Sequence, residues 1–434
     1  MKIIFSIIIP AYNCNDFISQ CVNSITSQQS ILQDKIEILI INDASTDGSA
    51  SKIRNLQKIF PNIRILFNKK NKGVSLSRNK GIKNALGEYI IFLDSDDYLK
   101  KNCLKLIYNE ILRKNEPEVI FGRFKKKTYP FNNDTLIKNY NYSKYNTKKF
   151  IRKIIDKKFP LDECWPYIVK KNFLLENKIK FLNVRVAEDQ LYVVQILVNM
   201  KTFSVYRKTF YVHQNLAGTL SDFMDLKSTI CCLKVLLQYL NLINSKKIKS
   251  NTILFQFINI YIQSLFSMFT SLLIMMSKKD IFVLSKILSK YHNFYNSLKK
   301  YPENVHLGLM IKVHGSFNGL LLYKKEIIRI KCNIINNFIK DKRNIYFYCY
   351  SKFLGASRII MGKSWFKIKS ILDQNINLKN KIFNGKKIID PNSLVFKKND
   401  SIIINNHREI TIKKIFNSLV TKGVDYKNIL ILRY

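Results

Sequence analysis

The chain has 434 residues, which is enough for two or three domains, each with its own core. Its hydrophobic fraction of 47% and aromatic fraction of 12% exclude a disordered or fibrous protein. The eight cysteines are irregularly spaced and include no C-x-x-C pair, which argues against a disulfide framework or a cysteine zinc site. These features predict a folded cytosolic protein with reduced thiols.

The formal net charge of +43 is concentrated outside the first quarter of the chain. Residues 1–113 carry 16 Lys and Arg against ten Asp and Glu, so +37 of the excess lies in the other 321 residues. Nucleic acid, an anionic membrane surface and the amino-acid bias of a Lys/Asn/Ile-rich genome are the competing explanations. No nucleic-acid-binding motif occurs, so among specific partners we favour the anionic membrane, and we expect no nucleic acid.

The first apolar run, Ile3–Ile9, resembles a short signal peptide. It has only seven residues, Pro10 ends it, and no small-residue cleavage site follows. We therefore predict a buried first strand, in a protein that lies in the cytoplasm at the inner face of the cell membrane.

Apolar runs alternate with helical patterns over the first 113 residues. The four runs are Ile3–Ile9, Ile36–Ile41, Ile63–Phe67 and Glu88–Leu93. Continuously apolar strands separated by helices predict a mostly parallel, Rossmann-like α/β sheet covered on both faces. Ligands bind beyond the carboxyl ends of such strands, where Pro10–Asp16, Asn42–Gly48 and Asp94–Asp97 should meet.

The patterns along the chain predict three domains: an α/β domain (1–222), a helical region (223–335) that could be membrane-associated and a small C-terminal α/β domain (336–434). After a strand over Pro117–Phe124, the basic, Tyr/Asn-rich segment up to Lys158 predicts an insertion on the acceptor side. A helix is expected over Ile410–Lys422.

The stretch Ile253–Met276 contains 24 residues without a charge and is flanked by lysines. Its length fits a membrane span, but Gln256, Asn259 and Gln263 dilute its hydrophobicity. A buried bundle helix and an interfacial helix remain open as alternatives to a span.

The acidic run Asp94–Asp97 follows the fourth apolar run directly. A sugar that leaves a nucleoside diphosphate leaves negative charge behind, and a divalent cation held by carboxylates neutralises it. Taken alone, the run has an equally plausible explanation, because an acidic strand end often caps the next helix, and Asp97 before Tyr98 suits that role.

Three further motifs surround this acidic run in a fixed order. They are Ser6–Asn13, Ile40–Ser49 and Asn71–Gly81. With Asp94–Asp97 they resemble the family-2 inverting glycosyltransferases of the GT-A fold, over residues 3–100. Ala44 stands where that family usually has Gly, and Ser77 where it often has Ala.

The resemblance implies a nucleotide-sugar donor, most commonly a UDP-sugar. It places Asp43 against the base, while Pro10, Tyr12 and Asn13 line the base pocket. Asp43 could instead form a turn within its own loop. Lys72 and Arg78 would face the diphosphate, unless they only decorate a helix.

The same resemblance implies Mn²⁺ or Mg²⁺ as a cofactor. Asp96 would be the direct ligand, with Asp94 and Ser95 close to the ribose or sugar of the donor and Asp94 as a second possible ligand. His213 could reach the metal or the diphosphate, although a lone histidine is more often structural.

An inverting transfer needs a general base for the acceptor hydroxyl. The family places an acidic pair there, and Ala187–Tyr192 matches it, with Ala187 at a site often held by Gly. Asp189 is the candidate base and Glu188 its neighbour; the alternative is a carboxylate pair at a helix N-terminus. Trp165–Phe181 resembles the segment that shapes the acceptor site.

The segment Asn344–Leu354 resembles the first strand and turn of a Rossmann-like domain. Cys349, Ser351 and Leu354 replace the glycines that let a backbone approach a pyrophosphate. We therefore expect a docking or scaffolding domain without a bound dinucleotide.

Together these features predict a metal-dependent glycosyltransferase that acts on a cell-surface glycan or lipid-linked acceptor, such as a capsule or lipopolysaccharide precursor. Two alternatives remain. One is a non-catalytic basic scaffold that binds anionic lipid or polymer, and the other is a sugar nucleotidyltransferase.

Overall fold

The computed structural model describes eleven segments of the chain. They are residues 2–28, 34–126, 147–156, 163–214, 226–249, 252–288, 305–342, 344–349, 354–373, 379–405 and 409–432. The chain divides into two compact units, Met1–Thr219 with Ile248–Ile258, and Leu220–Lys247 with Asn259–Tyr434. Most of the expected acceptor-side insertion lies outside the described residues, and the three-domain division stays a prediction.

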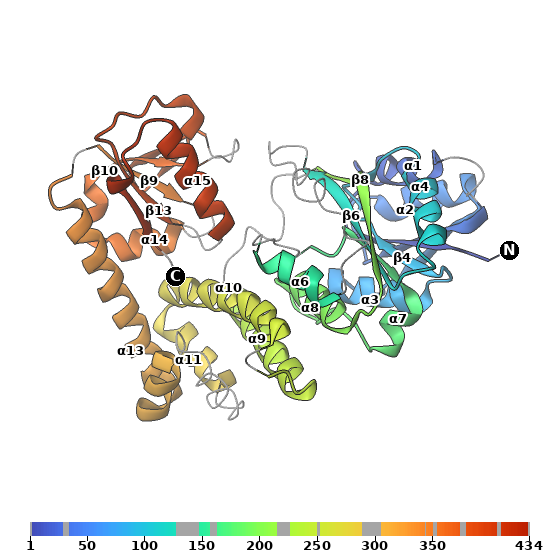
Figure 1. The fold of residues 1–434 in the computed structure, drawn as a ribbon, viewed down its shortest axis with the longest axis horizontal. Helices are drawn as coiled ribbons and strands as arrows, with labels where there is room; N and C mark the ends of the chain where they lie inside the picture. Colours follow the sequence, from blue (N-terminus) through green and yellow to red (C-terminus); the bar gives the residue numbers. More distant parts are fainter. Residues whose placement is uncertain are drawn as a thin grey trace. The chain divides into compact units, whose positions relative to one another are not determined.

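The first unit is built on an eight-stranded sheet in the order β3-β2-β1-β4-β7-β6-β8-β5. Figure 1 shows this sheet with helices packed against it; its strands β4, β6 and β8 are labelled. Its first four strands are β1 (Phe5–Ala11), β2 (Ile36–Asn42), β3 (Ile63–Phe67) and β4 (Tyr89–Phe92). They are all parallel, and β1 and β2 are buried along almost their whole length. The parallel sheet predicted from the apolar runs is therefore confirmed.

The other half of the sheet is mixed. Its strands are β5 (Tyr98–Leu99), β6 (Val119–Lys126), β7 (Tyr167–Lys170) and β8 (Phe203–His213). β7 runs antiparallel to both β4 and β6, β8 is parallel to β6, and β5 is antiparallel to β8. Because only β7 is inverted between β4 and β6, strand β8 runs in the same direction as β4 and ends at the same edge of the sheet as the acidic loop.

Helices pack on this sheet through apolar faces. They are α1 (Ile18–Thr26), α2 (Ser49–Ile59), α3 (Val74–Asn84), α4 (Cys103–Arg113), α6 (Thr147–Asp156), α7 (Lys171–Glu176) and α8 (Glu188–Asn199). In α1 the buried residues are Ile18, Cys21, Val22 and Ile25, which is the spacing of one helical face. The three helices expected between the first strands are confirmed.

Asp97 does not cap a helix. The chain continues from it into the short strand β5, and α4 begins only at Cys103. The capping alternative for Asp97 is therefore wrong, and its carboxylate has other partners, described below.

Helices dominate the chain after β8. They are α9 (Leu226–Ser245), α10 (Ile253–Met275), α11 (Lys278–Leu288) and α13 (Val305–Ile339). Helix α10 begins in the first unit and continues into the second, and the others lie in the second unit. In α10, the uncharged stretch, Phe257, Leu265, Phe269 and Leu273 are buried in the protein. That burial agrees with the buried-helix alternative for this stretch.

A different helix is long and apolar enough to cross a membrane within the part of the chain that the structure covers. It is α9, with 20 residues, a mean hydropathy of 1.3 and 56% burial of the apolar window. Length and composition are the only grounds, and core helices of soluble proteins meet the same criteria. Membrane contact stays a prediction.

The C-terminal part is a separate α/β sheet in the order β11-β12-β10-β9-β13-β14. Its elements are β9 (Ile345–Cys349), α14 (Leu354–Met361), β10 (Ile368–Leu372), β11 (Ile382–Phe383), β12 (Lys386–Ile389), β13 (Ser401–Asn405), α15 (Glu409–Thr421) and β14 (Ile429–Leu432). All neighbours are parallel except β11, which pairs antiparallel with β12. The strands added on either side of β9 follow the Rossmann order. The expected α/β unit is confirmed, and β11 and β12 are additions that its sequence pattern did not reveal.

Candidate functional site

The loops after β1 and β2 are joined by hydrogen bonds at the carboxyl end of the sheet. The Asn13 backbone N–H donates to Ser45 Oγ at 3.1 Å, and the Thr46 N–H donates to Asn13 Oδ1 at 2.8 Å. A second link runs from the Asn15 N–H to Asp47 Oδ2 at 3.1 Å. The predicted convergence of these polar loops at one edge is confirmed.

Ala44 and Ala187 both adopt left-handed backbone conformations, with φ of 59° and 62°. These are the two positions where the glycosyltransferase resemblance expects glycine. A Cβ in this conformation crowds the following carbonyl, whereas glycine adopts it without strain. The chain therefore keeps the loop geometry and accepts backbone strain at both positions.

Asp43 organises the third loop. Its carboxylate accepts hydrogen bonds from Asn68 Nδ2 at 2.7 Å, from the Lys72 N–H at 2.9 Å and from the Gly73 N–H at 2.7 Å. These partners belong to the loop between β3 and α3, so Asp43 is not merely turning its own loop. The contact with a nucleotide base stays a prediction.

Tyr12 and Lys72 are the exposed members of the predicted donor site. The Tyr12 ring is 48% exposed, so its face is open to stacking on a planar ligand. The Lys72 ammonium has no hydrogen bond or ion pair with the described residues and stays available to an anion. Pro10 is half-buried at the end of β1 beside them.

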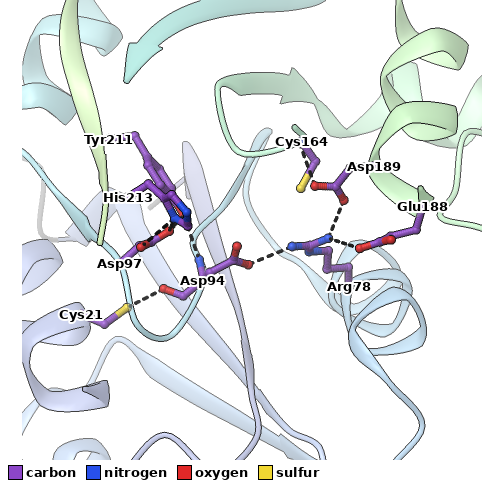
Figure 2. Close-up of polar contacts among 9 residues, drawn as sticks. All are labelled: Cys21, Arg78, Asp94, Asp97, Cys164, Glu188, Asp189, Tyr211 and His213. Carbon is purple, nitrogen blue, oxygen red and sulfur yellow. Dashed lines mark hydrogen bonds and ion pairs between the residues drawn. The ribbon is translucent and has the colours of Figure 1, made fainter. Parts of the chain in front are cut away.

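Asp97 is fully buried and joins the acidic loop to the end of β8. Its carboxylate accepts from Tyr211 Oη at 2.5 Å and from the Gln214 N–H at 2.8 Å, and His213 Nδ1 lies 3.0 Å away (Figure 2). The Asp94 N–H donates to Tyr211 Oη at 3.3 Å. Trp165 stacks on Tyr211, with ring centroids 4.7 Å apart, and on His213 at 5.5 Å.

Asp96 is the carboxylate of the acidic loop that has no hydrogen bond or ion pair with the described residues. Burial and the negative charges of Asp94 and Asp97 raise its pKa to about 6. An ionisable oxygen ligand that repels its neighbours and lacks a counter-charge is suited to a divalent cation.

No group of three His, Cys, Asp or Glu side chains in the described segments is placed to hold a metal ion by itself. A hard cation such as Mg²⁺ typically takes one or two carboxylates and completes its shell with substrate phosphates and water. His213 fits this arrangement, because Asp97 at Nδ1 orients the ring as a carboxylate does for a ligating histidine. The residues therefore fit a metal shared with a diphosphate, and the ligand set stays a prediction.

Arg78 is buried at the centre of the site, on α3. Its Nη2 is 2.8 Å from Asp94 Oδ1, and its Nη1 is 2.6 Å from Asp189 Oδ1 and 3.8 Å from Glu188 Oε1 (Figure 2). We expected this guanidinium to face a diphosphate, but it lies among three carboxylates. Its role in donor binding stays a prediction.

Glu188 and Asp189 form the first turn of α8, as the helix-terminus alternative required, and both also face Arg78. Burial and the Asp189 charge raise the pKa of Glu188 to about 8. Burial also raises the pKa of Asp189, while Arg78 opposes that rise. The Cys164 N–H donates to Asp189 Oδ2 at 3.2 Å and fixes the second oxygen of this carboxylate.

Residues 6–172 match the sequence model of the family described as "Glycosyl transferase family 2". This part of the chain is a family-2 glycosyltransferase domain. The match extends past the acidic loop to the end of β7, so it includes every predicted donor-side residue except His213.

Several curated relatives resemble this glycosyltransferase domain. A poly(ribitol-phosphate) beta-glucosyltransferase of Bacillus spizizenii is 32% identical over 47% of this chain and 31% of that protein. A cholesterol galactosyltransferase of Borreliella burgdorferi is 30% identical over 50% of this chain and 62% of the relative. The poly(ribitol-phosphate) beta-N-acetylglucosaminyltransferase TarP of Staphylococcus aureus is 31% identical over 48% and 60%. The matches thus span less than two thirds of each relative.

Among solved structures, S. aureus TarS residues 1–349 in complex with UDP-GlcNAc is similar to this chain. The TM-score is 0.48 at 19% sequence identity, over 73% of this chain and 90% of that one.

Two residues of the candidate site are not predicted from the sequence. Asn68 ties the third loop to Asp43, and the Cys164 N–H donates to Asp189. Asn68 is the first polar residue after a predicted strand, which could have indicated it, whereas the position of Cys164 depends on where the segment before β7 packs. Tyr211 joins Asp94 to Asp97; the sequence marks it only as the start of Tyr211–Gln214, which resembles the family's Tyr/Arg/His loop.

Proposed function

We propose that this domain transfers a sugar from a UDP-sugar to a hydroxyl group of a growing cell-surface glycan or lipid-linked acceptor, with inversion at the anomeric carbon. The observation that carries the proposal is the arrangement around Arg78. It brings the donor-side carboxylate Asp94 and the candidate base Asp189 to opposite ends of one guanidinium. The names of the relatives, which include transferases for poly(ribitol phosphate), support an acceptor at the cell surface.

The donor nucleotide would bind over the joined loops after β1, β2 and β3. Tyr12 is exposed and would stack on the base, next to Pro10 and Asn13, and Lys72, in the loop that Asp43 organises, would face the diphosphate. Asp94 and Ser95 would face the ribose or the sugar. A base contact with Asp43 remains chemically reasonable, because each carboxylate oxygen has more than one acceptor position.

A divalent cation, Mn²⁺ or Mg²⁺, would be held by Asp96, with Asp94 and His213 as further candidate ligands. When bound, it would supply positive charge to the departing diphosphate. The chain's own contribution is to keep Asp96 without a competing cation and to orient His213 through Asp97.

Asp189 would accept the proton of the acceptor hydroxyl as that oxygen attacks the anomeric carbon. The bond from this carbon to the diphosphate oxygen breaks at the same time, and the electron pair leaves with UDP. Asp189 suits the base role better than Glu188, because it lies 2.6 Å from Arg78 and Glu188 lies 3.8 Å away. The closer ion pair favours the ionised form of Asp189, while Glu188 retains the proton.

The alternatives differ in measurable ways. A non-catalytic basic scaffold gains nothing from carboxylates gathered around a buried arginine, and it would bind polyanions without responding to UDP and metal. A sugar nucleotidyltransferase would release pyrophosphate from a sugar phosphate and a nucleoside triphosphate.

The test is a panel of nucleotide sugars, measured for release of UDP or other diphosphates with Mn²⁺ and with EDTA. We expect one or a few UDP-sugars to be hydrolysed slowly, only with metal, and UDP with Mn²⁺ to raise the thermal unfolding temperature. Pyrophosphate release from nucleoside triphosphates, or no response to any nucleotide, would refute the proposal.

A further inference from the structure

Arg78 joins segments that are far apart in the sequence. The guanidinium-bearing residue Arg78 is only 3% exposed. It pairs with Asp94, in the loop after β4, and with Asp189, which lies 111 residues after Arg78 in the sequence. The two pairs use different nitrogens, Nη2 toward Asp94 and Nη1 toward Asp189 (Figure 2). One planar group thus sets the spacing between the donor side of the site and the candidate base.

Aromatic packing fixes the plane of this guanidinium. Its central carbon lies 5.2 Å from the centroid of the Phe181 ring and 6.0 Å from that of Phe92. Phe181 in turn stacks on Tyr192 of α8, with centroids 4.1 Å apart and the rings 7° from parallel. Because α8 also carries Glu188 and Asp189, the same packing holds the cation and two of its carboxylates.

The charge balance shows why the cation matters. Three partly buried carboxyl groups surround one guanidinium, so removing the cation would leave the negative charges of Asp94 and Asp189 without a counter-charge at this position. A lysine would keep the charge, but its single ammonium group cannot place two donors in the rigid fork of arginine.

We propose that Arg78 is a positioning residue that holds Asp189 and Asp94 at a fixed separation and orientation, rather than a ligand of the donor diphosphate. The proposal rests on the proposed function, because it assigns the base to Asp189. It leaves Lys72, exposed and without an ion pair among the described residues, as the cation for the diphosphate.

The experiment combines two Arg78 variants with a double-mutant cycle. Arg78→Gln, Arg78→Lys, Asp189→Asn and the double variant Arg78→Gln with Asp189→Asn are compared with the natural protein. UDP affinity with Mn²⁺ is measured by calorimetry, and kcat and KM are measured for the best donor from the panel. Arg64→Gln is the matched control, because Arg64 pairs with Glu37 in the same domain, outside this site.

We expect UDP affinity to change by less than about threefold in both Arg78 variants, while kcat falls about 100-fold or more in Arg78→Gln and about tenfold in Arg78→Lys. The double variant should be no slower than Asp189→Asn, because both changes disable the same interaction. Arg64→Gln should lower thermal stability and leave kcat unchanged.

Three results would overturn the inference. UDP affinity that falls tenfold or more with kcat retained would make Arg78 a diphosphate ligand. Losses in kcat that add in the double variant would show that Arg78 and Asp189 act independently. A natural protein that turns over no nucleotide sugar would refute the proposed function, and the role of Arg78 would fall with it. If Arg78→Gln does not fold, UDP affinity and kcat are compared between Arg78→Lys and the natural protein instead. The same changes in these two quantities then support or refute the inference.

Discussion

At the scale of single residues, the acidic loop separates three carboxylates by their partners. The Asp97 carboxylate is buried and bonded to Tyr211, His213 and Gln214. The Asp94 carboxylate forms an ion pair with Arg78, so both carboxylates already have partners in the protein. Asp96 has no such partner among the described residues, and its pKa is raised to about 6. Of these three aspartates, Asp96 is therefore the one whose carboxylate is best suited to bind a metal ion.

Asp96→Ala should abolish metal-dependent hydrolysis of the best nucleotide sugar, with kcat/KM reduced at least about 100-fold, since the direct metal ligand is lost. Thermal unfolding should change little, because the Asp96 carboxylate forms no hydrogen bond or ion pair with another described residue. Asp34→Ala, an exposed carboxylate before β2, is the control and should retain full activity. Full activity in Asp96→Ala would show that the metal assignment is wrong.

Glu188 offers a pH-dependent prediction. Its pKa rises from an ordinary 4.5 to about 8 in the folded protein, so folding is favoured while this group is protonated. The resulting stability is fully present below about pH 4.5 and is lost as the pH rises through 8.

Glu188→Gln mimics the protonated form and should remove this loss. Relative to the natural protein, the variant should become progressively more stable between about pH 5 and pH 8, as measured by thermal unfolding. A stability difference that is constant over this range, or that falls with pH, would contradict the assignment of the proton to Glu188.

At the scale of elements, two loops are held in conformations that their residues adopt only with strain. Ala44 follows β2, and Ala187 immediately precedes α8, with φ of 59° and 62°. Both loops place acidic side chains of the site, Asp43 in one and Glu188 and Asp189 in the other. The two strained alanines are thus direct sequence neighbours of acidic residues of the candidate site.

Ala44→Gly and Ala187→Gly should each stabilise the protein by about 0.5–1 kcal/mol, because relief of the left-handed strain exceeds the added flexibility of the unfolded chain. Ala85→Gly is the matched control: its φ is −60°, so the glycine should destabilise by a similar amount. Denaturant unfolding measures all three. Destabilisation in the first two variants would mean that the alanine methyl groups contribute packing that outweighs the strain.

At the scale of the whole molecule, the glycosyltransferase domain carries the candidate site, while most of the excess positive charge lies beyond residue 113. The C-terminal sheet shares a hydrophobic core with the ends of α10 and α13, around Trp365 and Phe347. Their basic composition supports the proposal that the protein works at the anionic inner face of the cell membrane.

The complete protein should sediment with vesicles that contain phosphatidylglycerol and not with pure phosphatidylcholine vesicles. Binding should weaken strongly between about 0.1 and 0.5 M salt, because surface charges are screened at about 3–10 Å over that range. Equal binding to both vesicles would favour an apolar insertion, and no binding to either would leave genome composition as the source of the charge.

The local pattern of this sequence was enough to predict the parallel half of the sheet. Apolar runs of five to seven residues have one stable environment, a strand covered on both faces, and the ends of such strands must meet at one edge. The sequence therefore predicts that the loops carrying Asn13, Asp43 and Asp94 lie at one edge of the sheet, as they do. The direction of strand β7 could not be predicted, because an inverted strand has the same composition as a parallel one.

Tertiary structure alone assigned partners to the charged groups. The sequence predicts that Arg78 faces the diphosphate or only decorates a helix, yet it is buried against carboxylates from two distant segments, because α3 packs where the strand end and α8 converge. The sequence could name Asp94, Asp96, Glu188 and Asp189 as acidic candidates, since residue type and order are local properties. Ion pairing, burial and pKa depend on distances between elements, and only the folded chain sets those.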